Sequence, residues 1–225
     1  MRFKDVFSII GPPMIGPSSS HTAGAARIGR AARQLFGRLP QRADVIFYGS
    51  FAATYEGHGT YAAVVGGLLD MATDDVRLPD SLDIAMQEGM QPEAITGKGL
   101  YPHPNTAELH LYENSEDEEP AFTLVGTSIG GGNIEIVSID GFKVKMTGNY
   151  PTLVIQNADA PGMIAIVARL LQHHGINIGT MTVDRKSRSG EAMMVLETDE
   201  DFPPTLRGEL AAYAEIHTVR FVHIT

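Results

Sequence analysis

The sequence of 225 residues contains no cysteine and no tryptophan. Without cysteine the chain forms no disulfide, offers no thiolate nucleophile and supplies no cysteine ligand to a metal centre. No segment reaches the roughly 18 to 20 apolar residues of a membrane span, and the opening "MRFKDVFSIIGPP" lacks a signal-peptide core of adequate length. We therefore expect a cytoplasmic protein.

Basic residues are also scarce, with 17 Lys and Arg against 27 Asp and Glu and a net charge of -10. This balance argues against a nucleic-acid partner, which normally requires a concentrated basic face. Four arginines nevertheless follow the first motif, Arg27, Arg30, Arg33 and Arg38. We interpret them as a solvated helix face, with an anion-attracting or partner-facing patch as the alternative.

The length predicts two domains, and the ordinary globular composition gives each a core to bury. The fold class is α+β. In the first domain, residues 1–147, we expect a short strand near 6–10, a helix over about 21–36, a buried strand "ADVIFYGSF" over 43–51, a helix over about 60–71 and a third helix begun by Asp80 or Ser81.

From Asn105 the apolar period becomes two, which predicts the strands "NTAELHLY", "AFTLVGTS", "NIEIVSID" and "FKVKMTG" in a mixed sheet covered by helices. Asp140-Gly141 is a strong hairpin signal between the last two. The acidic run "ENSEDEEP" is interpreted as an exposed hairpin loop, and a partner-docking role is a distant second.

After a linker at 148–151 the pattern restarts as a second domain, residues 151–225. Its predicted elements are a strand "TLVIQN", a helix over 161–174, strands "INIGTMTVDR" and "EAMMVLETD", a helix over 203–213 and a strand "IHTVRFVHI". The order is βαββαβ, the ferredoxin-like split motif.

Three polar turns carry the candidate site. Ser18, Ser19, Ser20, His21 and Thr22 stand where the first helix begins, and a helix start attracts an anion such as a carboxylate through its unpaired N–H groups. Simple capping by Ser20 or Thr22 is the alternative. The other two turns are "YEGHGT", with His58, Gly59 and Thr60, and "YPHPNT", with His103, Asn105 and Thr106. If the three converge, they form a pocket for a small polar carboxylate.

The stretches "GPSSSHTAGAARIGRAAR", "GSFAATYEGHGT" and "HPNT" resemble the β subunit of bacterial iron-sulfur-dependent L-serine dehydratase (serine ammonia-lyase) over essentially the whole chain. The N-terminal domain resembles the allosteric substrate-binding domain of some phosphoglycerate dehydrogenases. The C-terminal domain, with "NADAPG" and "HHGINI", resembles an ACT domain.

The resemblance implies conversion of L-serine to pyruvate and ammonia, in serine catabolism and gluconeogenesis. It implies a [4Fe-4S] cluster that acts as a Lewis acid and is ligated by an α subunit, with no metal ligand in this chain. The residues agree, because elimination of hydroxide needs a strong electrophile and this chain has neither cysteines nor a recognisable pyridoxal-type lysine motif. Activity is therefore expected only with the α subunit.

By the same resemblance, His21 and His58 are the catalytic candidates, and which of them does what stays open. The substrate-binding candidates are Ser18, Ser19, Ser20, Thr22, Gly59, Thr60, His103, Asn105 and Thr106. An effector site is expected at Asp159, Pro161, Gly162 and Asn177, although these residues also make a good turn and cap without any ligand.

Two other functions are alternatives to this one. The chain could be an amino-acid-binding regulatory subunit without a direct catalytic role, or a hydrolase with a metal on His21, His58 and His103, whose spacing fits no standard zinc pattern. We also expect a homodimer through the ACT-like or the N-terminal domain, because an exposed sheet edge invites pairing.

Overall fold

The computed structural model describes residues 12–188 and 190–224. It has a mixed α+β architecture with two sheets and divides into two compact units, one up to Gly141 together with Ile224 and the other over residues 142–223. The division falls in the turn after Ile139, whereas the sequence places the end of the first domain at residue 147. The predicted strand at 6–10 lies outside the described residues.

The larger sheet has six strands in the order β2-β1-β3-β4-β5-β6. Strands β1 and β2 are parallel, and β1-β3, β3-β4 and β4-β5 are antiparallel. The bounds are β1 Arg42–Tyr48, β2 Gln91–Thr96, β3 Asn105–Tyr112, β4 Phe122–Gly130, β5 Asn133–Ile139 and β6 Phe142–Met146. In β1 buried and half-buried residues alternate, which is typical of a sheet with one face on a core.

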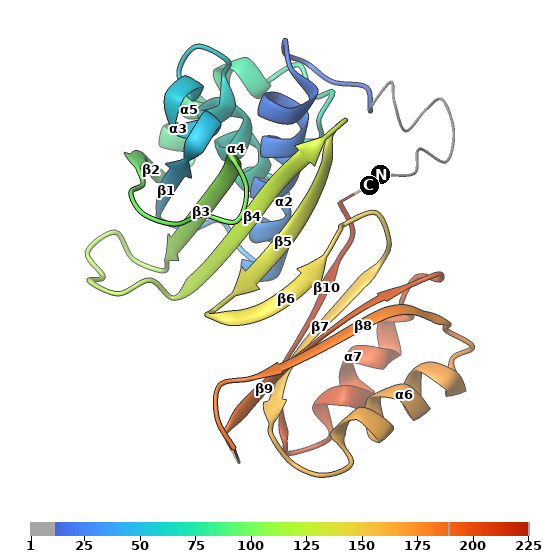
Figure 1. Cartoon of the computed structure of the whole chain (residues 1–225). Coiled ribbons are helices and arrows are strands. Elements are labelled where there is room, and N and C mark those ends of the chain that lie inside the picture. The colour runs from blue at the N-terminus through green and yellow to red at the C-terminus, as the bar shows by residue number, and fades with distance from the viewer. Residues whose placement is uncertain (1–11, 189, 225) are drawn as a thin grey trace. The chain divides into compact units, whose positions relative to one another are not determined.

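Helices cover one face of this sheet (Figure 1). They are the π-helical turn η1 Ser19–Ala23, which runs directly into α2 Gly24–Phe36, then α3 Gly49–Thr54, α4 Thr60–Leu68, the 3-10 turn η2 Leu78–Asp80 and α5 Ser81–Gln87. The alanine-rich α2 presents a nearly continuous buried surface, and it ends at Gly37, which takes the left-handed conformation that favours glycine.

Helices α2 and α4 pack against each other through glycines. A Cβ atom on Gly29 would lie 2.1 Å from the carbonyl oxygen of Val64, and one on Gly67 would lie 2.1 Å from that of Ala26. Only glycine permits backbones to approach so closely. This contact sets the relative position of η1 and the start of α4, from which two of the three polar turns arise.

Several predicted elements of the first domain are confirmed with shifted ends. The first helix begins earlier, as a π-helical turn, and α4 ends at Leu68 rather than 71. Both Asp140 and Gly141 have positive φ, 48° and 77°, so the hairpin prediction is confirmed. The acidic run lies between the antiparallel strands β3 and β4, as expected for a hairpin loop.

Other predictions for this region are wrong. The strand "ADVIFYGSF" stops at Tyr48, because Gly49, with φ 55°, turns the chain into the unpredicted helix α3. Strand β2 was also missed. The third helix, α5, does begin at Ser81 directly after Asp80, as predicted. Asp80 nevertheless makes no side-chain capping bond, and the Ser81 hydroxyl donates to the Ala62 carbonyl at 2.6 Å.

The arginines of α2 do not form a uniformly solvated face. Arg27 is buried, and its Nη1 donates to the Gly132 carbonyl at 2.9 Å. Burial, and secondarily the charge of Arg30, lower the pKa of Arg27. Arg30 pairs with Asp70 at 2.8 Å, and Arg38 pairs with Glu113. The interpretation as a solvated face is therefore wrong for Arg27.

The second unit has a four-stranded antiparallel sheet in the order β10-β7-β9-β8, with both helices on one face (Figure 1). Its elements are β7 Thr152–Ala158, α6 Met163–His173, β8 Ile178–Arg185, β9 Glu191–Thr198, α7 Pro204–Ala211 and β10 Ile216–Val222. The predicted βαββαβ element order is observed. Helix α6 begins after the left-handed Gly162, so Pro161 precedes the helix rather than opening it.

The buried carboxylate of Glu197 binds the segment that precedes β7. One oxygen of Glu197 in β9 accepts from the N–H and hydroxyl of Thr147, at 2.6 and 2.7 Å, and from the N–H of Gly148 at 3.2 Å. The other accepts from Thr180 at 3.2 Å. These bonds compensate the desolvation of the carboxylate and hold Thr147 and Gly148, at the predicted linker, against the sheet.

Candidate functional site

The serine-rich turn is a π-helical entry into α2. Ser18 is the N-cap, and its Oγ accepts from the N–H of His21 at 3.2 Å. Its carbonyl accepts from Thr22 N–H at 2.8 Å. The cap is therefore Ser18, and the predicted capping by Ser20 or Thr22 is wrong. With Ser18 as cap, the hydroxyl of Ser20 is available to contact the side chain of His21.

The ring of His21 lies at the centre of the site. Its Nδ1 is 3.0 Å from Ser20 Oγ and 3.4 Å from Ser18 Oγ, and its Nε2 is 3.1 Å from Ser50 Oγ. The ring meets those of Phe51 and His58 edge to face, with centroids 5.2 and 5.1 Å apart. Burial and, secondarily, repulsion by His58 lower the pKa of His21. Both effects favour the neutral form of the imidazole.

The third turn is tied to the first through α3. The Pro104 carbonyl accepts from Ser50 N–H at 2.7 Å, so the loop that carries His103 is attached to the serine that holds His21. Within the loop, His103 Nδ1 accepts from Asn105 N–H at 3.1 Å, and its carbonyl accepts from the Thr106 hydroxyl at 2.5 Å. The side chain of His103 thus braces its own loop.

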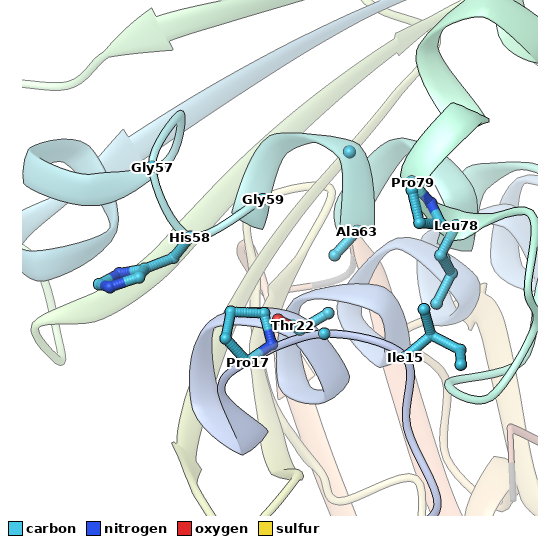
Figure 2. A pocket seen from close by; sticks show the side chains of 11 residues that line it. Ile15, Pro17, Thr22, Gly57, His58, Gly59, Ala63, Leu78 and Pro79 are labelled. Carbon is cyan, nitrogen blue, oxygen red and sulfur yellow. The ribbon is translucent and has the colours of Figure 1, made fainter.

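Two cavities meet at the turn around His58. One, of about 210 Å³, is shown in Figure 2; apart from His58 and Thr22 its walls are glycines, prolines and aliphatic side chains. Its lining is Ile15, Gly16, Pro17, Thr22, Gly57, His58, Gly59, Ala62, Ala63, Leu78 and Pro79. The second, of about 560 Å³, is lined by residues 52–58 and Thr96 at the end of β2. His58 therefore lies between two spaces that a ligand can enter.

Three buried hydroxyls around the turns have no hydrogen-bond partner within the described residues: those of Thr22, Thr60 and Ser128. Thr60 and Ser128 are fully buried and Thr22 nearly so. Thr22 also lines the smaller cavity. An unsatisfied buried hydroxyl is unfavourable. Of the three, Thr22 is placed where a ligand in the cavity can satisfy it.

Comparison with known proteins gives the family of the chain. A family model described as "Serine dehydratase beta chain" matches residues 3–99, which include the first two turns. The probable L-serine dehydratase β chain of Bacillus subtilis is 47% identical over 216 residues, covering 96% of each chain. The L-serine dehydratase β chain of Peptoniphilus asaccharolyticus is 32% identical over 226 residues, covering 100% of each. The chain belongs to the serine dehydratase β-chain family.

The predicted resemblance to the β subunit of L-serine dehydratase is thus confirmed. A D-3-phosphoglycerate dehydrogenase of Synechocystis is 28% identical over 193 residues, which cover 85% of this chain and 34% of that enzyme. The β chain therefore also resembles part of a phosphoglycerate dehydrogenase, the class of enzyme to which the sequence pattern pointed.

Most of the predicted site residues of this β chain gather around His21. Ser18, Ser20, His58 and, through Pro104, the loop of His103 are linked to its ring by the contacts above. Asn105 lies at the edge of the group, where its amide donates to the Ser128 carbonyl at 3.4 Å. Thr60 and Thr106 are fully buried, and the Thr106 hydroxyl holds the loop of His103. Gly59, with φ 66°, forms the bend before α4.

Sequence reasoning missed Ser50 and Phe51. Both stand in the quoted "GSFAATYEGHGT", but they were assigned to the end of a strand, where no role in the site suggested itself. A glycine after a buried strand followed by "SFAAT" could have indicated a strand-to-helix turn, which commonly presents side chains to a site.

The predicted effector residues lie in the second unit. Asp159 pairs with Arg185 at 3.2 Å, and Pro161 and Gly162 form the exposed turn before α6. The amide of Asn177 donates to Asp199 at 2.7 Å. Asn177 also lines a cavity of about 400 Å³ between the end of α6 and the start of β8, whose walls do not include the other three residues.

Proposed function

We propose that this chain is the β subunit of an L-serine dehydratase and that it forms L-serine's binding site together with an α subunit. The observation that carries the proposal is the meeting of the three motif turns at His21. The names of the full-length relatives from Bacillus and Peptoniphilus support the same substrate.

In the proposed site the serine turn receives the carboxylate of L-serine. The start of η1 carries the partial positive charge of a helix N-terminus, which favours an anion. The hydroxyls of Ser18 and Ser20 lie at the same place, beside the His21 ring. Conversion of L-serine to pyruvate and ammonia removes a proton from Cα and hydroxide from Cβ. A histidine beside the carboxylate is suited to accept or return a proton.

The loss of hydroxide also needs an electrophile. The family resemblance implies that a [4Fe-4S] cluster is this electrophile. The residues of this chain do not fit such a cluster, because the sequence has no cysteine. Over residues 12–188 and 190–224 no three potential His, Cys, Asp or Glu ligands lie together either. We therefore assign the cluster to the α subunit.

The test is co-expression of this chain with a cysteine-rich α chain, followed by an anaerobic assay for pyruvate from L-serine. Activity is expected only from the mixture. The variant His58→Asn should retain assembly and cluster content and lose turnover by about 100-fold or more. Pyruvate from the β chain alone, or full activity of the α chain alone, would contradict the proposal.

For the second unit, we propose an ACT domain with an amino-acid effector bound near Asn177. The βαββαβ order and the cavity beside Asn177 support this assignment. Calorimetry of the full chain with L-serine should show a binding heat that Asn177→Ala removes and His58→Ala leaves. A heat unaffected by Asn177→Ala, or no heat with any amino acid, would end the effector proposal.

No helix in the described part of the chain has the length and apolar character that a membrane span requires.

A further inference from the structure

Both ring nitrogens of His21 already contact hydroxyl groups of this chain. Nδ1 is 3.0 Å from Ser20 Oγ, and Nε2 is 3.1 Å from Ser50 Oγ. Because a hydroxyl both donates and accepts, these two serines satisfy either neutral tautomer of the ring, and the imidazolium as well, without movement of heavy atoms. A substrate atom reaches a ring nitrogen of His21 only by displacing a serine.

His58 differs from His21 in this respect. Within residues 12–188 and 190–224 its ring nitrogens make no hydrogen bond, and the exposed residue His58 is part of the lining of both cavities of the site. Figure 2 shows His58 projecting from the bend between Gly57 and Gly59. Of the two histidines, His58 is therefore the one placed to meet a ligand directly, and the ring of His21 stands behind it.

The position of Ser50 is fixed by its backbone. Its N–H donates to the Pro104 carbonyl at 2.7 Å, and its carbonyl accepts from the Thr54 hydroxyl at 2.7 Å. The preceding Gly49 has φ 55°, and a Cβ there would lie 2.6 Å from the Pro104 oxygen. Ser50 thus presents its hydroxyl from a rigid junction between α3 and the loop of His103.

We propose that Ser50 is a positioning residue of this site: it holds the His21 ring from the Nε2 side, so that this ring supports His58, the histidine that meets the substrate. The inference rests on the proposed function and gives the two histidines different roles: His58 contacts the substrate and His21 supports His58. It follows that Ser50 acts on turnover without contacting L-serine.

The test compares three variants. Ser50→Ala removes the hydroxyl and Ser50→Thr keeps it. Ser138→Ala, in β5 and away from the site, is the control. Ring-nitrogen NMR spectra of the full-length chain, with His21 assigned from a His21→Asn variant, report the contact itself. Steady-state kinetics of each variant with the α subunit report its effect.

For Ser50→Ala we expect a shifted His21 Nε2 resonance and a kcat lower by up to about 100-fold, with little change in KM. Ser50→Thr should restore both, and Ser138→Ala should change neither. An unchanged Nε2 resonance in Ser50→Ala, or equal impairment of the Ala and Thr variants, would overturn the inference. If Ser50→Ala does not fold, Ser50→Cys replaces it, with the same expectation.

The two proposals fail separately. If the wild-type mixture makes no pyruvate, the proposed function is wrong, but the nitrogen resonances still decide whether Ser50 holds His21. If the mixture is active and Ser50→Ala behaves as wild type, only the role of Ser50 is wrong.

Discussion

At the scale of single residues, the surroundings of His21 set its protonation. Burial first, and the neighbouring His58 second, lower the pKa of His21 below its ordinary 6.5. The unfolded chain therefore binds a proton at this residue more readily than the folded chain does. The stability that His21 contributes is complete above pH 6.5 and is lost as the pH falls from 6.5 towards the lowered pKa of the folded state.

A titration of the full-length chain by NMR should give His21 a midpoint below 6.5. His58→Asn should raise that midpoint, because it removes the like charge, yet leave it below 6.5, because burial remains. His217→Asn, in the second unit, serves as the control and should have no effect. A midpoint above 6.5, or one that His58→Asn leaves unchanged, would contradict the described burial of His21 or its repulsion by His58.

At the scale of helices and strands, the glycine contact between α2 and α4 brings the serine turn and the His58 turn together. Gly67→Ala should force the two backbones apart and destabilise the first unit by about 1–3 kcal/mol. This loss exceeds the helix-propensity gain of up to about 1 kcal/mol that alanine brings. Urea unfolding measures the difference.

The matched control is Gly208→Ala in α7, where a Cβ would meet nothing within 4 Å. The same exchange should there stabilise the second unit by up to about 1 kcal/mol. Equal effects at both positions would mean that helix propensity, rather than the close approach of α2 and α4, decides the outcome.

At the scale of the whole molecule, the outermost strands of the two sheets are candidate sites of self-association. Strand β8 forms one edge of the four-stranded sheet, and its Val183 is 47% exposed. We propose that two chains pair through this edge, because an exposed strand with apolar side chains is a template for another strand. In light scattering the chain should have the mass of a dimer, and Val183→Lys should reduce it to that of a monomer.

Ile164→Lys is the control for this change, since Ile164 is similarly exposed, at 51%, but lies on α6. It should leave the dimer intact. A monomeric wild-type chain, or a dimer that tolerates Val183→Lys, would place the subunit contact elsewhere or remove it.

Much of the second unit could be predicted from its sequence, because most strands and helices there have their own apolar period and are followed by a glycine, a proline or a charged residue. The turn at Asp140-Gly141 is equally local, since both residues tolerate positive φ. Strand β2 was not predicted, because its sequence has no such local signal. "QPEAIT" carries a proline and a polar pattern, and it forms a strand because β1 offers a parallel edge.

The sequence alone determined the family, through the three polar motifs, and the need for outside cysteines if a cluster is to be bound. These properties depend on residue identity and short spacing. Only the tertiary structure decided that Ser50 contacts His21, 29 positions away, and that the ring of His58 packs beside it. Such contacts depend on how β1, α3 and α4 meet η1, a long-range packing arrangement for which no local stretch of the chain carries a signal.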